Sequence, residues 1–255
     1  MINVHFIIHE VFEAPGAYEN WAKGKGYGVT YSRIYESEPL PPNANDLDIL
    51  IVMGGPQNPA TTLEECSYFD AKREINFIRK FVSENKPIIG VCLGSQLLGE
   101  AFGAKFDNSP FTEIGSYPIT LTEEGERNEM FVHFPKNVTV GHWHGDMPGL
   151  LPESKVIAYS EGCPRQIVQY SDIAYGFQCH MEFTPEVVEL LIEASQKELE
   201  ELSGGKFIQS PEELRGNNYR EMNELLYGFL DRLVERYILI QRSQGLTSAM
   251  HQPRR

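Results

Sequence analysis

Short apolar runs alternate with segments of helical periodicity along the first part of the chain. The runs, one of which alternates with polar residues, predict strands at residues 2–8, 29–34, 48–53 and 87–91. Apolar positions that recur every three or four residues predict amphipathic helices over 16–24 and 69–82, and another helix follows residue 92. Because strands and helices alternate, we expect an α/β protein with a doubly wound, mostly parallel sheet and helices on both faces.

The pattern changes after residue 105. Residues 105–179 lose the helical periodicity and contain short apolar segments separated by turns, which predicts an antiparallel or mixed part of the sheet. The last strand of this part is expected over 174–179. Thr184-Pro185-Glu186 then has the residue types that begin a helix, since threonine caps, proline fits the first position and acid suits the first turn.

Two helices are expected in the C-terminal part. The first runs to about residue 201, where a Ser-Gly-Gly segment follows, and the second spans about 218–240 with a continuous apolar stripe. We therefore expect a main domain over 1–200, a helical extension packed on it over 201–240, and a flexible tail over 241–255. In the interpretation that we favour, the apolar stripe of the helix 218–240 packs on the chain's own domain. In the alternative, it forms a docking surface for a partner protein.

Composition narrows the class of partner. The chain has 255 residues and a formal net charge of −14, which disfavours nucleic acid and anionic membranes as partners because both would repel it. No apolar run approaches the roughly 18 residues that a membrane span needs, and the N-terminus lacks the basic region of a signal peptide. Four cysteines without a Cys-x-x-Cys pair indicate reduced thiols, so we expect a cytoplasmic protein.

A cysteine stands between a buried strand and a predicted helix, in the segment IIGVCLG at residues 88–94. Gly90 and Gly94 lie two residues on either side of Cys92, which is the spacing of a nucleophile elbow, where larger side chains would collide. Such a turn presents the thiol at the carboxyl edge of the sheet, where ligands bind in open α/β folds. The N-terminus of the helix is expected to favour the thiolate. The alternative is a buried cysteine that only fills space.

A nucleophilic thiol needs a base, and His180 is the best candidate among seven histidines. It follows the predicted strand 174–179, so it reaches the same edge of the sheet as Cys92. Glu182 can hold one ring nitrogen and leave the other to face the sulfur.

Two further segments contain residue types found in active sites. Gly54 and Gly55 end the third predicted strand, where glycines let backbone N–H groups approach a substrate as an oxyanion hole requires. The segment HWHGD at residues 142–146 contains two histidines and an aspartate, a combination that also occurs in metal sites. No third soft ligand is apparent nearby, so we expect no metal.

The order of the motifs MGGP, GVCLGSQLL, HWHGD and GFQCHMEFTPE resembles class I glutamine amidotransferases, most closely the amidotransferase part of GMP synthetases. The resemblance covers about residues 45–190 and implies a flavodoxin-like α/β fold. It also implies that Cys92 attacks the side-chain amide of L-glutamine to give a γ-glutamyl thioester and ammonia, with His180 moving the proton and Glu182 orienting it. The family pattern further assigns substrate contacts and oxyanion amides, to Gly54, Gly55, Leu93, Gln96, Trp143 and His144. It implies no cofactor.

The chain departs from the family pattern at three points. Cys179 and Met181 replace the usual phenylalanine and proline on either side of the histidine. The ATP pyrophosphatase signature of GMP synthetases is absent, because Ser203-Gly204-Gly205 is followed by Lys206 and lacks the aspartate. No Walker A sequence occurs. These features indicate a free-standing amidotransferase-like protein.

Four interpretations follow. The chain could be a glutaminase that hands ammonia to a separate synthase subunit, or a stand-alone hydrolase of γ-glutamyl peptides or conjugates. The third is a cysteine-elbow protein of the DJ-1/PfpI kind, which the His-x-Glu pair and the MGGP segment disfavour. The fourth is a non-catalytic regulatory member of the family. We expect the first or second, with glutamine or a γ-glutamyl compound as substrate.

Overall fold

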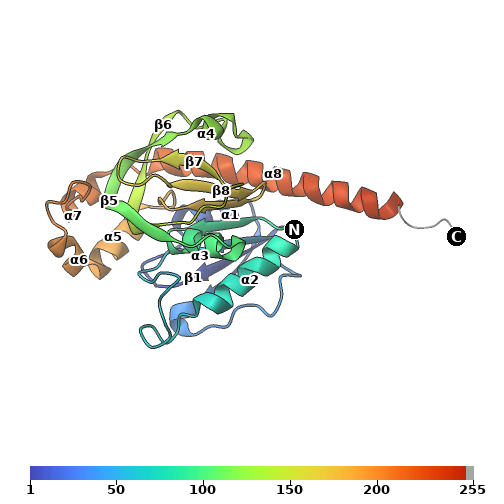
Figure 1. Ribbon diagram of the computed structural model, residues 1–255, viewed down its shortest axis with the longest axis horizontal. Coiled ribbons are helices and arrows are strands. Elements are labelled where there is room, and N and C mark those ends of the chain that lie inside the picture. Colours follow the sequence, from blue (N-terminus) through green and yellow to red (C-terminus); the bar gives the residue numbers. More distant parts are fainter. Residues whose placement is uncertain (251–255) are drawn as a thin grey trace.

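The computed structural model describes the backbone of residues 1–250 and the side chains of residues 1–243. A single nine-stranded sheet forms its centre (Figure 1), with the strand order β2-β1-β3-β4-β9-β8-β7-β5-β6. The strands are β1 (Asn3–Ile8), β2 (Gly28–Arg33), β3 (Ile49–Val52), β4 (Ile88–Val91), β5 (Asp107–Leu121), β6 (Asn137–Met147), β7 (Lys155–Tyr159), β8 (Ile167–Ser171) and β9 (Ala174–Phe177).

The sheet has a parallel half and an antiparallel half. β2, β1, β3, β4 and β9 pair in parallel, whereas β9, β8, β7, β5 and β6 pair in antiparallel fashion. The doubly wound α/β fold is therefore confirmed, and so is the antiparallel section after residue 105. The sheet is mixed rather than mostly parallel, because half of its strand pairs are antiparallel.

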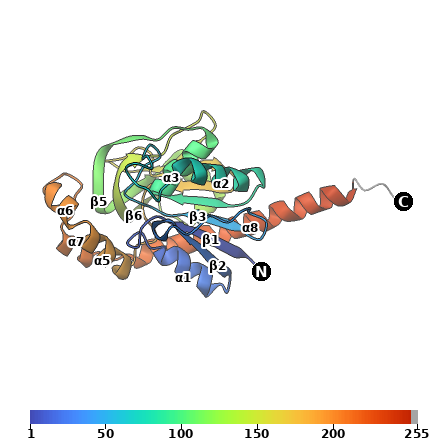
Figure 2. The same ribbon diagram turned by 90° about the horizontal axis from the view of Figure 1, so that it is seen from below.

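Helices cover both faces of the sheet (Figure 2). They are α1 (Gly16–Gly24), α2 (Ala71–Ser83), α3 (Leu93–Phe102), α4 (Glu123–Arg127), α5 (Pro185–Ala194), α6 (Gln196–Glu201), α7 (Pro211–Gly216) and α8 (Arg220–Met250), with short 3₁₀ turns at Ile34–Glu36 and Glu129–Phe131. One core lies between the sheet and α1, α5 and α8, and a second lies under α2 and α3. Alternation along β1 supplies both, since Phe6 faces the first core and Ile7 the second.

The C-terminal helices differ in part from the predicted ones. The helix predicted from Thr184 to about 201 is divided at Ser195 into α5 and α6, and α7 was not predicted. α7 begins with a capping box between Ser210 and Glu213. The predicted helix 218–240 corresponds to α8, which continues to Met250 and extends beyond the body of the molecule (Figure 1). Of the predicted tail, residues 251–255 lie outside the described part of the chain.

Parallel strands place their carboxyl ends at one edge of the sheet, and this edge collects the predicted site. β1 is followed there by the loop containing His9 and Glu13, β3 by Gly54 and β4 by Cys92. β9 is followed by the segment 178–182. Within the described residues, no helix is both long and apolar enough to cross a membrane.

Candidate active site

Cys92 occupies a strained turn between β4 and α3. Its backbone has φ 49° and ψ −109°, a conformation that residues with a side chain rarely adopt. A Cβ atom at Gly90 would lie 2.2 Å from the carbonyl oxygen of Gly94, and one at Gly94 would lie 2.0 Å from that of Val52. Both glycines are thus required by backbone contacts, and the predicted nucleophile elbow is present.

The sulfur of Cys92 is almost fully buried and has polar neighbours. The Gln178 Nε2 group donates to Sγ at 3.4 Å, and the thiol lies 3.6 Å from the carbonyl oxygen of Trp143. Burial raises the pKa of the Cys92 thiol, although His180 and the N–H group of Leu93 act to lower it. The N-terminus of α3 therefore favours the thiolate as predicted, but its effect on the Cys92 pKa is smaller than the effect of burial. Forming the thiolate requires a base.

His180 is fixed beside Cys92 with one ring nitrogen engaged. Its backbone pairs with Gly141 of β6 through hydrogen bonds of 2.8 and 3.0 Å, and its ring stacks on Phe183 at a centroid distance of 4.6 Å. Nδ1 donates to the Glu182 Oε1 atom at 2.6 Å, whereas the buried Nε2 has no hydrogen-bond partner among the described residues. Burial lowers the pKa of His180. The Glu182 carboxylate and Cys92 raise the pKa by more than burial lowers it, so that the net pKa lies well above 6.5. The ring of His180 thus binds a proton more strongly than an ordinary imidazole and acts on Cys92.

A cavity of about 460 Å³ opens above the thiol, a size typical of small-ligand sites. Cys92 lines it together with four of the predicted substrate residues, Gly55, Gln96, Trp143 and His144. The other two, Gly54 and Leu93, are not among the lining residues in the described part of the chain. Leu93 instead directs its N–H group at the sulfur, and its side chain packs in the core under α2 and α3.

Two residues that line the cavity, Gln96 and Trp143, differ in how their polar groups are used. Gln96 donates through Nε2 to Gln178 at 3.3 Å, and its Oε1 atom is buried without a partner among the described residues. Trp143 is held in place by the hydrogen bond from its Nε1 group to Glu198 of α6, 3.0 Å long. A polar substrate could therefore satisfy Gln96 Oε1.

Three residues of this site, Gln178, Glu198 and Glu13, were not predicted from the sequence. Strand alternation offered a signal for Gln178, because residues 178 and 180 share a side of an extended segment. Glu198 reaches the cavity only because α6 folds over it, a tertiary arrangement without a sequence signal.

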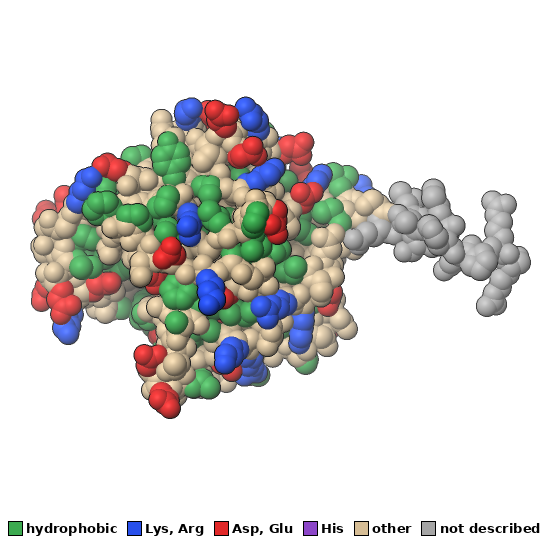
Figure 3. Space-filling model, viewed as in Figure 1, with side chains coloured by type: hydrophobic (Ala, Val, Ile, Leu, Met, Phe, Trp, Pro, Cys, Tyr) green, Lys and Arg blue, Asp and Glu red, His purple; other side chains and the backbone are tan. Residues whose placement is uncertain are grey.

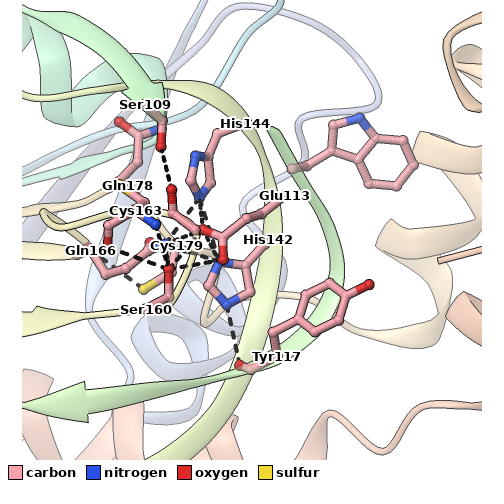
Figure 4. A network of polar contacts seen from close by, with 12 residues as sticks. Ser109, Glu113, Tyr117, His142, His144, Ser160, Cys163, Gln166, Gln178 and Cys179 are labelled. Atoms are coloured by element: carbon pink, nitrogen blue, oxygen red, sulfur yellow. Dashed lines mark hydrogen bonds and ion pairs between the residues drawn. The ribbon is translucent and has the colours of Figure 1, made fainter. Parts of the chain in front are cut away.

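A buried polar network lies behind His144 (Figure 4). Glu113 of β5 lies 3.6 Å from His142 Nδ1 and 3.4 Å from His144 Nε2, so the fold supplies a third ligand that the sequence did not reveal. The ligand atoms of these three residues lie within 4.8 Å of one another. Burial lowers the pKa of His142 to about 3, so that its ring is neutral.

Two histidines and a carboxylate form a donor set that suits zinc. The Gln166 Nε2 group, however, lies among them, 2.6 Å from Glu113 Oε2 and 3.2 Å from each ring nitrogen. The Gln166 amide thus occupies the position that a metal ion would take between the three side chains, and it donates a hydrogen bond to the Glu113 carboxylate. The network orients His144, whose side chain lines the cavity.

Comparisons with known proteins agree with this geometry. The sequence profile of the family Glutamine amidotransferase class-I matches residues 24–193. The glutamine amidotransferase-like protein YfeJ of Salmonella typhimurium is 56% identical over 232 residues, which cover 91% of this chain and 97% of that protein. A crystal structure of a glutamine amidotransferase from Thermotoga maritima superposes with a TM-score of 0.81 at 26% identity, covering 92% of this chain and 98% of that one.

The similarity to GMP synthetases is more limited. A glutamine-hydrolysing GMP synthase subunit of Pyrococcus abyssi is 36% identical over 100 residues, which cover 38% of this chain and 52% of that protein. The resemblance predicted from the motifs is confirmed, and the DJ-1/PfpI alternative is not the family that the profile identifies. The chain belongs to the class I glutamine amidotransferase family.

Proposed function

We propose that this chain hydrolyses the side-chain amide of glutamine, or of a related γ-glutamyl compound, through a thioester on Cys92. The observation that carries the proposal is the state of His180. Its Nδ1 atom is bound to Glu182 at 2.6 Å, while Nε2 is buried, unpartnered among the described residues and close enough to act on the pKa of Cys92. A base oriented in this way beside a buried thiol is the arrangement that nucleophilic catalysis requires.

The reaction takes two steps. His180 Nε2 takes the proton of the thiol, the sulfur attacks the amide carbon, and the oxygen becomes an oxyanion that backbone N–H groups of Gly55 and Leu93 stabilise in the family pattern. Nε2 then gives its proton to the nitrogen as the C–N bond breaks, which leaves the thioester and the amine. In the second step His180 deprotonates a water molecule, which attacks the thioester and releases the γ-carboxylate and the thiol.

The experiment is glutamate release by the purified chain from L-glutamine and from a panel of γ-glutamyl amides and peptides. Cys92→Ala should reduce turnover by at least about a thousandfold, the scale of loss for a nucleophile. Cys163→Ala is the matched control, because Cys163 is also a buried free thiol but lies outside the cavity lining. Equal turnover by wild type and Cys92→Ala would contradict the proposal.

The panel also separates the variants of the function. Turnover of glutamine would support a glutaminase, whether it feeds a separate synthase subunit or acts alone. Cleavage of γ-glutamyl peptides without cleavage of glutamine would identify a γ-glutamyl hydrolase. The absence of turnover on every compound, together with slow alkylation of Cys92 at neutral pH, would support a non-catalytic family member.

A further inference from the structure

Glu13 has a buried carboxylate to which none of the described residues donates a hydrogen bond. It lies in the loop between β1 and α1, its side chain is 6% exposed, and it lines the cavity that contains Cys92. No hydrogen bond from a described residue is among the interactions that act on its carboxylate, and Glu13 lies outside residues 24–193, which the family profile matches. A buried carboxylate without a hydrogen-bond donor lowers the stability of the fold. Packing therefore does not account for a glutamate at this position.

The surroundings of Glu13 are the reacting groups. Its Oε2 atom fills the space beside Gly54, where a Cβ would lie only 2.3 Å away, so the glycine admits the carboxylate. The charged groups that act on it are His180 and Glu182 after β9, and His9 and Glu10 on its own loop. Glu13 in turn acts on the Cys92 thiol.

The balance of these charges lets Glu13 keep its proton up to about neutral pH. Burial, followed by Glu182 and Glu10, raises the pKa of Glu13 to about 7, although His180 and His9 act to lower it. Once His180 has given up its proton, its positive charge no longer offsets the effect of the Glu182 carboxylate on Glu13. A cation placed beside Glu13 would pair with its carboxylate.

We propose that Glu13 receives the leaving nitrogen of the amide and holds it as an ammonium ion. The inference rests on the proposed function and names a role for a residue of the same site. After His180 has protonated the nitrogen and the C–N bond has broken, the departing ammonia takes the proton of the Glu13 carboxyl group. The products of this step are ammonium and the Glu13 carboxylate, and the carboxylate regains a proton from water after the ammonium has left.

The outer cavity suits a departing cation. Asp146, Glu198 and Glu201 line the cavity together with Lys197, whose ammonium group pairs with Glu201 at 3.4 Å. Acidic side chains also gather at the left edge of the molecule, over the end where Figure 1 places α6 (Figure 3). Because ammonium is not a nucleophile, this site favours hydrolysis with release of ammonium over transfer of ammonia to an acceptor. The same site would take a protonated amine from a γ-glutamyl amide.

The test compares Glu13→Gln with Glu10→Gln, which makes the same side-chain substitution in the same loop. Glu10 lies outside the cavity lining and accepts hydrogen bonds from Gln57 and Tyr68, an ability that glutamine keeps. The readout that does not need turnover is the pH dependence of Cys92 alkylation by iodoacetamide, followed on its peptide by mass spectrometry. It is measured in ammonium chloride and in sodium chloride at equal ionic strength.

Ammonium should lower the apparent pKa of Cys92 by roughly one unit relative to sodium in the wild type and in Glu10→Gln, because a bound cation stabilises the thiolate. Glu13→Gln should show no difference between the two salts. Equal pKa values in both salts for the wild type, or an unchanged ammonium response in Glu13→Gln, would overturn the inference.

The second measurement is the inhibition of turnover by ammonium. Ammonium should inhibit glutamate release by the wild type more strongly than sodium does, and Glu13→Gln should lose this difference. A wild type that hydrolyses γ-glutamyl amides without ammonium sensitivity would refute the role of Glu13 alone. A wild type that hydrolyses none of them would refute the proposed function, while the alkylation measurement would still decide whether Glu13 binds ammonium.

Discussion

Among single residues, two buried glutamates of the same site have opposite environments. The Glu182 carboxylate is bound to His180 at 2.6 Å, whereas the Glu13 carboxylate has no hydrogen-bond donor within the described residues and a pKa of about 7. The first carboxylate fixes the tautomer of the base. The second is free to meet a group that arrives with the substrate. The same side-chain type thus serves two purposes, and its surroundings decide which.

Glu13→Gln should stabilise the fold, increasingly so as the pH rises. The pKa of Glu13 is about 7 in the fold against 4.5 for an ordinary glutamate, so the folded chain binds the proton more tightly. Stability contributed by this group is therefore lost between about pH 4.5 and pH 7, by roughly 2 to 4 kcal/mol. Urea denaturation of wild type and variant at pH 5 and pH 8 measures it. An equal difference in unfolding free energy at both pH values would contradict a buried, titrating Glu13.

Sequence reasoning selected the three residues that we propose react and missed their neighbours for a physical reason. Cys92, His180 and Glu182 have local signals, namely a glycine spacing, a strand end and a two-residue separation. Glu13 and Gln178 acquire their roles from the packing of loops at the sheet edge. Nothing in the sequence near Glu13 indicates that its carboxylate will be buried beside Cys92.

Among elements, the turn from β4 into α3 has the least tolerance for change. Gly94→Ala should destabilise the chain by about 3 kcal/mol or more, since its methyl group would lie 2.0 Å from a backbone oxygen of β3 that cannot rotate away. Gly24→Ala is the matched control in α1, where a Cβ would meet no atom within 4 Å and alanine should add about 0.5 kcal/mol. Thermal unfolding compares the two. Similar melting temperatures for both variants would refute the account of the elbow.

The elements themselves were predictable to different degrees. The strands and helices up to α3 follow from hydrophobic periodicity, because each buries a continuous face. The division between α5 and α6 at Ser195 has no strong local breaker, and the short α7 depends on its capping box rather than on an apolar stripe. The antiparallel strand order likewise depends on long-range pairing, which no local pattern determines.

Across the whole molecule, α8 completes the core on the face opposite α2 and α3 (Figure 2). Phe229 is fully buried, with ring centroids 5.2 Å from Phe131 and 5.1 Å from both Tyr175 and Phe177. Trp21 of α1 and Lys25, the residue that follows α1, both donate hydrogen bonds to Asp231, which ties α8 to α1. The C-terminal helix therefore packs on the sheet whose carboxyl edge holds Cys92.

Phe229→Ala should lower the unfolding free energy by about 3 to 5 kcal/mol, the usual loss for a buried phenylalanine. Leu239→Ala removes an apolar side chain from the same helix at a position that is 58% exposed, and it should change stability by less than about 0.5 kcal/mol. Chemical denaturation measures both. A small effect of Phe229→Ala would show that α8 does not belong to the cooperative unit.

The measurement that tests the central claim most directly is detection of the γ-glutamyl thioester. Wild-type protein is mixed with L-glutamine or with the best γ-glutamyl substrate, quenched in acid within the first turnovers, digested and analysed by mass spectrometry. The account predicts a γ-glutamyl adduct on the peptide containing Cys92 that hydroxylamine removes at neutral pH. Glutamate formation without such an adduct, or an adduct on another cysteine with Cys92 unmodified, would contradict it.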